Sequence, residues 1–290
     1  MLKLIECPRD AWQGLSQTIP TAEKVSYLHQ LITCGFHHID AVSFVSPKYV
    51  PQMADSEAVM AELSAAGIAK QGIEIIGIVV NEKGIERALK TPGVTTVGYP
   101  HSLSAKFLES NAHTTIDRSR ALVATMVRET QAAARDLVVY ISMAFGNPYG
   151  DPWSLDLLAQ EISRLAQTGV RQISLADTVG LASPEQIHEL LVAVLPAAEE
   201  VEIGVHLHSR PDRASEKVSA AWEAGCRRFD SALTGLGGCP FAGDDLLGNI
   251  PTEIVISTLE GRGESTGIAP RSLDQALEAT LEFRRRYAPH

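Results

Sequence analysis

The sequence predicts an α/β protein whose fold class is a (β/α)8 TIM barrel. Strand-like apolar runs alternate eight times with helical patterns, at a spacing of roughly 30 residues. Composition does not change along the chain, so we expect one catalytic domain over residues 1–290, a size that single barrels reach. Four glycines each close a predicted helix just before a strand, where a left-handed residue is needed: Gly35, Gly67, Gly169 and Gly225.

Eight segments have the composition of strands. The clearest is 73–80 (IEIIGIVV), whose nearly continuous apolar run is typical of a strand that is buried on both faces. The predicted strands are 2–7, 37–43, 73–80, 94–98, 137–143, 170–176, 202–207 and 227–232.

Helical periodicity fills the intervals between these strands. The predicted helices are 21–33, 52–66, 82–89, 116–135, 155–167, 184–195, 212–224 and 273–287, and residues 104–111 fall in a long loop after the fourth strand. The alternative architecture is a doubly wound open sheet, which lacks support because no GxGxxG motif follows the first strand.

Composition excludes several classes of partner. A net charge of −10 argues against a nucleic-acid or anionic-membrane partner, because either would need a basic surface. No apolar run approaches the roughly 18 residues of a membrane span, and the N-terminus resembles neither a signal nor a transit peptide. The four cysteines form no CxxC motif, and we assign three of them to the core: Cys7, Cys34 and Cys226. We therefore expect a cytoplasmic protein.

Polar side chains gather at the carboxyl ends of the predicted strands, where the active sites of such barrels lie. Asp10 follows the first strand, and His206 and His208 end the seventh. Because the histidines are two residues apart on a strand, they point to the same face. With Asp10, and Asn249 as a fourth ligand, they would suit Mg²⁺, Mn²⁺, Fe²⁺ or Co²⁺. The alternative is a hydrogen-bonded pair of strand histidines.

Two further residues bring chemistry to this set. Arg9 precedes Asp10, so its guanidinium would stabilise negative charge that develops near a metal, such as an enolate oxygen. The alternative for Arg9 is a structural salt bridge across the mouth of the barrel. Cys239 lies in a glycine-rich segment, where a thiol can exchange a proton with a substrate. The alternative for Cys239 is a small buried hydrophobic residue.

Six segments resemble those of the 3-hydroxy-3-methylglutaryl-CoA (HMG-CoA) lyase family, and together they run nearly from end to end of the chain. They are PRDAWQ at 8–13, SFVSPKYVPQMAD at 43–55, ISLADTVG at 173–180, HLH at 206–208, GLGGCPFA at 235–242 and GNIPTE at 248–253. The resemblance implies a divalent-cation-dependent enzyme that cleaves HMG-CoA, or a closely related 3-hydroxyacyl-CoA, into acetyl-CoA and acetoacetate. Such a reaction belongs to leucine degradation and ketone-body formation.

The resemblance also implies roles for individual residues. The ligands of a Mg²⁺ or Mn²⁺ ion would be Asp10, His206, His208 and Asn249. Arg9 would steady the enolate of the departing acetyl-CoA, and Cys239 would exchange a proton with the product carbon. His206 would also assist proton transfer at the tertiary hydroxyl. The remaining catalytic or substrate-binding positions are Asp40, Asp177, Gln13 and Ser43.

The chain departs from the family pattern around the expected pocket. The usual glutamate of the second strand is Asp40, and we expect Trp12 to reshape the pocket. Two other functions stay open: an acetyl-CoA-dependent synthase of the citramalate or isopropylmalate type, and a non-catalytic barrel that binds acyl-CoA. The expected partner in each case is an acyl-CoA, and the resemblance also suggests a homodimer.

Overall fold

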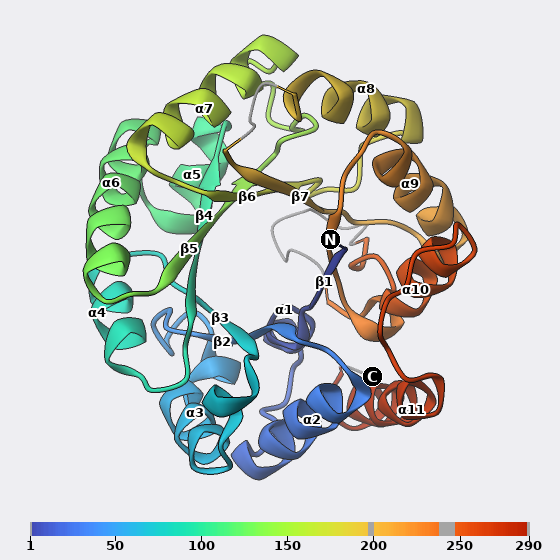
Figure 1. The fold of residues 1–290 in the computed structure, drawn as a ribbon. Coiled ribbons are helices and arrows are strands. Elements are labelled where there is room, and N and C mark those ends of the chain that lie inside the picture. The colour runs from blue at the N-terminus through green and yellow to red at the C-terminus, as the bar shows by residue number, and fades with distance from the viewer. Residues whose placement is uncertain (1, 197–199, 238–246, 289–290) are drawn as a thin grey trace.

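The computed structural model describes residues 2–196, 200–237 and 247–288. Its eight strands are parallel and close into a barrel in sequence order, with the first strand paired to the last through Lys3 and Arg228 (Figure 1). The strands are β1 (Lys3–Glu6), β2 (His38–Ser43), β3 (Glu74–Ile78), β4 (Thr96–Ser102), β5 (Asp136–Ser142), β6 (Gln172–Ala176), β7 (Glu202–His206) and β8 (Arg228–Ser231). The predicted TIM barrel is confirmed, and the open doubly wound sheet is excluded.

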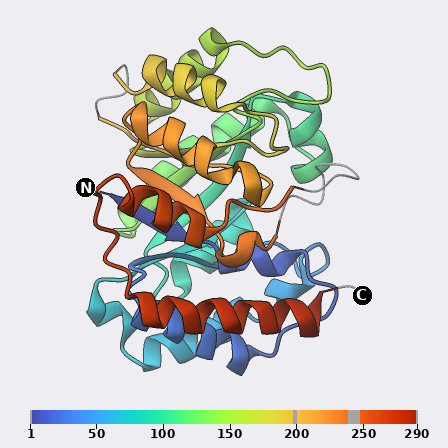
Figure 2. The ribbon, with the colours of Figure 1, turned by 90° about the vertical axis from the view of Figure 1, so that its right-hand side faces the viewer.

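Helices surround this sheet, and α11 packs beside α2, so the last helix closes the outer ring against the first long one (Figures 1 and 2). The helices are α1 (Pro8–Gln13), α2 (Thr21–Cys34), α3 (Ser56–Ala65), α4 (Glu82–Lys90), α5 (Ala105–Ala112), α6 (Ile116–Ala132), α7 (Leu155–Thr168), α8 (Pro184–Val194), α9 (Pro211–Glu223), α10 (Thr252–Glu260) and α11 (Pro270–Tyr287). Short 3₁₀ turns cover Pro51–Met53, Ile68–Gln71 and Leu233–Gly235.

Alternation along each strand divides the core into two layers. Outward-facing side chains pack under the helices in one continuous hydrophobic cluster. Inward-facing side chains fill the barrel in a second, smaller cluster: Ile5, Cys7, Ile76, Ile78, Val138 and Tyr140. The barrel interior is therefore a packed core, and a reactive site can lie only at its ends. Cys7, Cys34 and Cys226 are buried in these layers, as expected.

The four glycines all have positive φ angles, between 83° at Gly67 and 110° at Gly35, but Gly67 is followed by the 3₁₀ turn Ile68–Gln71 and not directly by a strand. Gly35 caps α2 in the left-handed conformation, with its N–H donated to the carbonyls of Ile32 and Leu31. A Cβ at Gly35 would lie 2.7 Å from the carbonyl oxygen of Gly267, so any side chain would displace the backbone there. Glycine is required at this position for both conformation and space.

Three helices were not predicted, and each is short. The six residues of α1 follow β1 directly, and the nine of α10 follow the segment after β8. The eight residues of α5 lie where we expected a loop, and Ser104 caps that helix by accepting the N–H of Phe107. Strand β4 also runs on to Ser102, four residues beyond the predicted end at residue 98.

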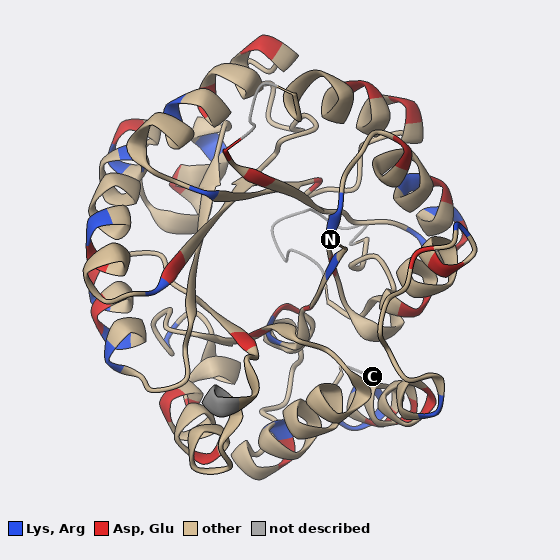
Figure 3. Cartoon of the chain, in the orientation of Figure 1, with Lys and Arg blue, Asp and Glu red and all other residues tan. Residues whose placement is uncertain are grey.

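No helix in the described part of the chain is long and apolar enough to cross a membrane. Acidic and basic residues are interspersed over the outer helices (Figure 3).

Candidate active site

The carboxyl end of β7 is extended by backbone pairing with the segment that precedes α10. His208 and Asn249 form an isolated antiparallel bridge, and the N–H of Ile250 donates to the carbonyl of Leu207 at 3.1 Å. The N–H of Ser209 donates to Gly248 on the other side, also at 3.1 Å. This pairing carries Asn249 to the His-x-His motif. The imidazole rings of that motif lie with their centroids 5.3 Å apart.

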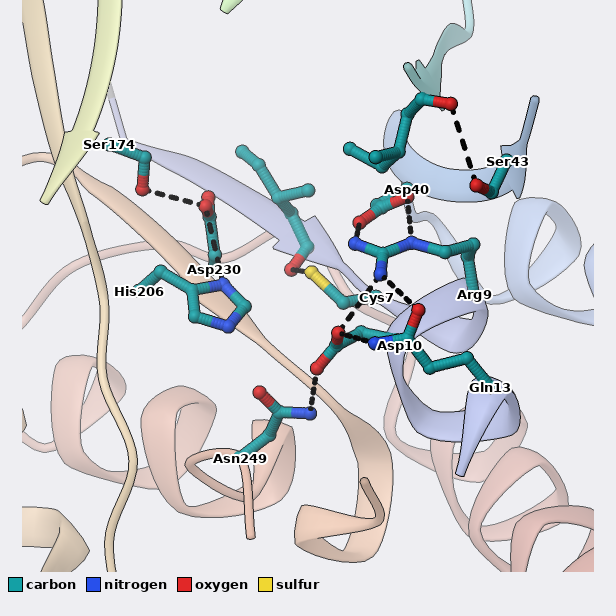
Figure 4. Close-up of polar contacts among 12 residues, drawn as sticks. Cys7, Arg9, Asp10, Gln13, Asp40, Ser43, Ser174, His206, Asp230 and Asn249 are labelled. Atoms are coloured by element: carbon teal, nitrogen blue, oxygen red, sulfur yellow. Dashed lines mark hydrogen bonds and ion pairs between the residues drawn. The ribbon is translucent and has the colours of Figure 1, made fainter. Parts of the chain in front are cut away.

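Asp10 reaches the same place from α1, just beyond β1. Its Oδ2 accepts the side-chain N–H of Asn249 at 2.8 Å, so the two ends of the chain meet here (Figure 4). Burial alone would raise the pKa of Asp10, but the charges of Arg9, His206 and His208 lower it to about 2. The expected ligands are therefore gathered around one ionised carboxylate.

The donor atoms of this cluster suit a divalent cation. The Oδ1 of Asn249 is buried and has no hydrogen-bond partner among the described residues. The Nδ1–H of His208 donates to the carbonyl of Leu247 at 3.1 Å, which leaves its Nε2 with a free lone pair. Burial and the charge of His206 lower the pKa of His208 and favour that neutral form. Two imidazoles, a carboxylate and an amide oxygen are ligands that Mg²⁺ and Mn²⁺ sites use.

In the part of the chain described, no three His, Cys, Asp or Glu side chains are already arranged as a formed metal cage. The oxygens of Asp10 are instead occupied by Asn249, Arg9 and Gln13. The fit to a cation therefore depends on the kinds of donors and on the unpartnered amide oxygen of Asn249.

Asp230, on β8, lies behind His206 inside the barrel. Its Oδ2 is 3.7 Å from Nδ1 of His206 and accepts the hydroxyl of Ser174 at 2.8 Å. The guanidinium of Arg228 balances its charge from 3.6 Å. Burial lowers the pKa of His206, but Asp230 and Asp10 outweigh it, so the pKa is raised. A carboxylate behind a ligating histidine commonly fixes its tautomer and orientation. Sequence reasoning missed Asp230, although an acidic residue inside the predicted strand 227–232 was a usable signal.

Arg9 joins the carboxylates at the mouth of the barrel. Its Nε donates to Oδ1 of Asp40 at 3.0 Å, and its Nη2 donates to Oδ2 of the same residue. Its Nη1 donates to Asp10 and to Gln13, each at 3.0 Å. The salt bridge considered as the alternative for Arg9 is thus present, and it holds the guanidinium directly beside Asp10.

Gln13 completes this group, because its side-chain N–H donates to Oδ1 of Asp10 at 3.0 Å. The structure does not bring the other two polar candidates into contact with Asp10. Ser43 lies at the end of β2, where its hydroxyl donates to the carbonyl of Ile78 at 3.5 Å (Figure 4). Asp177 follows β6 and pairs with Lys217 at 2.9 Å.

The expectation that Trp12 reshapes the pocket is wrong. Its side chain is 1% exposed and packs on the outside of the barrel, with its ring centroid 5.5 Å from Tyr27 and 6.1 Å from Phe283. From α1, Trp12 packs against Tyr27 of α2 and Phe283 of α11, while Arg9 and Asp10 contact Asp40 and Asn249. Cys239, the expected proton donor, lies outside the described residues.

Comparison with known proteins identifies the family of this chain. The HMGL-like family model matches residues 3–279. The chain belongs to the HMGL-like family. Members of this family cleave HMG-CoA and generally depend on a divalent metal.

Curated relatives match over most of their length. Mitochondrial hydroxymethylglutaryl-CoA lyase of Mus musculus is 34% identical over 96% of this chain and 83% of its own. Hydroxymethylglutaryl-CoA lyase of Pseudomonas mevalonii is 33% identical over 90% of this chain and 85% of its own. A solved HMG-CoA lyase from Acinetobacter baumannii, in complex with coenzyme A and 3-methylmalate, has a TM-score of 0.89. It is 32% identical and covers 100% of this chain and 93% of its own.

Proposed function

We propose that this protein is a divalent-metal-dependent lyase that cleaves HMG-CoA, or a closely related 3-hydroxyacyl-CoA, into acetyl-CoA and acetoacetate. The observation that carries the proposal is the meeting of Asp10, His206, His208 and Asn249 beside Arg9 at one end of the barrel. A barrel that merely bound acyl-CoA would have no need of an ionised carboxylate, two histidines and a guanidinium at one point.

Mg²⁺ or Mn²⁺ would be held by Asp10, His206, His208 and Asn249. When bound, the cation supplies Lewis-acid polarisation, which favours the alkoxide of the tertiary hydroxyl. The chain provides the alignment: Gln13 and Arg9 fix one oxygen of Asp10, and the backbone bridge fixes His208 against Asn249.

Carbon–carbon cleavage requires one proton to leave oxygen and one to arrive at carbon. His206 assists transfer of the tertiary hydroxyl proton to solvent, and the resulting carbonyl becomes the ketone of acetoacetate. The electron pair of the broken bond passes to the departing acetyl-CoA as its enolate, and Arg9 stabilises the enolate oxygen. Cys239 then donates its proton to the enolate carbon, which becomes the methyl group of acetyl-CoA.

The remaining candidates position these groups. Asp40 grips Arg9 with both oxygens, so it sets the direction of the guanidinium. Gln13 orients Arg9 and Asp10, Ser43 binds substrate, and Asp177 orients groups at the end of β6. The substrate partner is an acyl-CoA, in line with the coenzyme A in the Acinetobacter baumannii complex. The cytoplasmic location and the homodimer stay predictions from the sequence.

The test is incubation of metal-stripped protein with HMG-CoA, with and without Mg²⁺ or Mn²⁺, while acetoacetate is measured. We expect acetoacetate only when the metal is present. The Asp10→Asn variant is the control, and we expect it to be inactive. Absence of product across metals and pH would count against the proposal. Free CoA released from acetyl-CoA and a 2-oxo acid would instead identify the synthase.

A further inference from the structure

Lys217, on α9, places a buried ammonium group directly behind His208. Its side chain is 7% exposed, and its Nζ lies 2.9 Å from Oδ2 of Asp177, whose side chain is 2% exposed. The same Nζ donates to the carbonyl of His208 at 2.8 Å and to the carbonyl of Gly180 at 3.2 Å. An ammonium group has three N–H donors, so all three are used.

These acceptors follow two different strands. Asp177 and Gly180 lie in the connection between β6 and α8, whereas His208 lies beyond the end of β7. Lys217 therefore joins two strand ends from a third element, the helix α9. Both oxygens of Asp177 also accept the N–H of Ala182 at 3.2 Å, which anchors the carboxylate to the same connection.

His208 is consequently held at three points. Its carbonyl binds Lys217, its Nδ1–H binds the carbonyl of Leu247, and its backbone pairs with Asn249. Asp177 neutralises the ammonium, so the pair places no net charge behind the ligand set. The outcome is a fixed His208 whose free Nε2 has a defined direction.

We propose that Lys217 is a positioning residue for the metal site: it fixes the backbone of His208 and thereby sets the affinity for the divalent cation without touching it. This inference rests on the proposed function, since it requires His208 to be a ligand. Partners that orient metal ligands commonly change metal affinity by about 10- to 100-fold when they are removed.

The experiment measures Mn²⁺ binding by electron paramagnetic resonance on the full-length protein and its Lys217→Met variant. Methionine retains an unbranched side chain of similar length but removes the three donors. We expect the dissociation constant for Mn²⁺ to rise by about 10- to 100-fold, and saturating Mn²⁺ to restore most of kcat. The matched control is Arg213→Met, which removes an exposed cation from the same helix and should leave Mn²⁺ binding unchanged.

A second variant separates positioning from folding. Lys217→Met leaves Asp177 unpaired in a buried place, so that variant loses thermal stability. The double variant Asp177→Asn/Lys217→Met removes the unpaired charge, and we expect its Tm to recover while its Mn²⁺ affinity stays low. Mn²⁺ binding as tight as in the unmodified protein, in either folded variant, overturns the inference. An unmodified protein that binds neither Mn²⁺ nor Mg²⁺ overturns the proposed function as well.

Discussion

The contact between Arg9 and Asp40 yields the most quantitative prediction. The guanidinium donates twice to Asp40, once to Asp10 and once to Gln13, and both carboxylates are buried. In the variant Arg9→Met, Asp40 would stay buried without its ion-pair partner, and Asp10 would lose one of the positive charges that lower its pKa. We therefore compare Arg9→Met, Asp40→Asn and the double variant as a double-mutant cycle.

The expected magnitude follows from the burial of this pair. Removing one partner of a buried ion pair destabilises a protein by about 3–5 kcal/mol. An unfolding entropy of about 2.1 cal/mol/K per residue gives roughly 0.6 kcal/mol/K for a chain of 290 residues, so Arg9→Met should lower Tm by roughly 5–8 °C. The double variant should be more stable than the sum of the single changes predicts, by about 1–3 kcal/mol, because it no longer buries an unpaired Asp40.

Urea unfolding and HMG-CoA turnover are measured on the same preparations. Both variants that lack Arg9 should lose about 10²- to 10³-fold in kcat, the usual effect of removing one group that stabilises a developing oxyanion. Asp40→Asn, which keeps the guanidinium, should lose less. Stability changes that add to within about 0.5 kcal/mol, or an Arg9→Met enzyme with unchanged kcat, would refute the reasoning.

Three further predictions address other parts of the molecule. Burial raises the pKa of Glu6 from its ordinary 4.5 to about 8, although Thr252 and Leu233 donate hydrogen bonds to it. The folded state then keeps a proton that the unfolded state releases, so the free energy of unfolding should fall as pH rises from about 4.5 to 8. Urea unfolding of Glu6→Gln should lack this pH dependence. Equal pH dependence in the two proteins would contradict the assignment. Cys239→Ala should abolish acetoacetate release and leave Mn²⁺ affinity intact, and a weakened affinity would mean that the role of the thiol is misassigned. Asn249→Ala removes the unpartnered amide oxygen, so calorimetry should show weaker Mn²⁺ binding by at least about tenfold, and unchanged binding would remove Asn249 from the ligand set.

The barrel was predictable because its signal is repeated. Each long helix repeats apolar residues at helical spacing, and most strands carry an apolar run. Errors at single boundaries therefore do not change the alternation of strands and helices. The short helix α1 has no such signal, because six residues complete fewer than two turns. Its presence nevertheless decides that Asp10 faces the mouth while Trp12 packs against Tyr27.

The candidate site was predictable only in part. His206 and His208 follow from spacing along one strand, and Asp10 follows from the convergence of strand ends. The bridge between His208 and Asn249 is a tertiary pairing that no local pattern specifies. Asp230 and Lys217 were missed because each reaches its histidine from another element, β8 for Asp230 and α9 for Lys217, and no local pattern specifies that packing.

The most direct test of the central claim is a crystal structure of the Mn²⁺-soaked protein, with data collected at a wavelength where manganese scatters anomalously. We predict one strong anomalous peak in contact with Asp10, His206, His208 and Asn249. A manganese peak elsewhere in the barrel, with these four side chains left as they are, would contradict the claim.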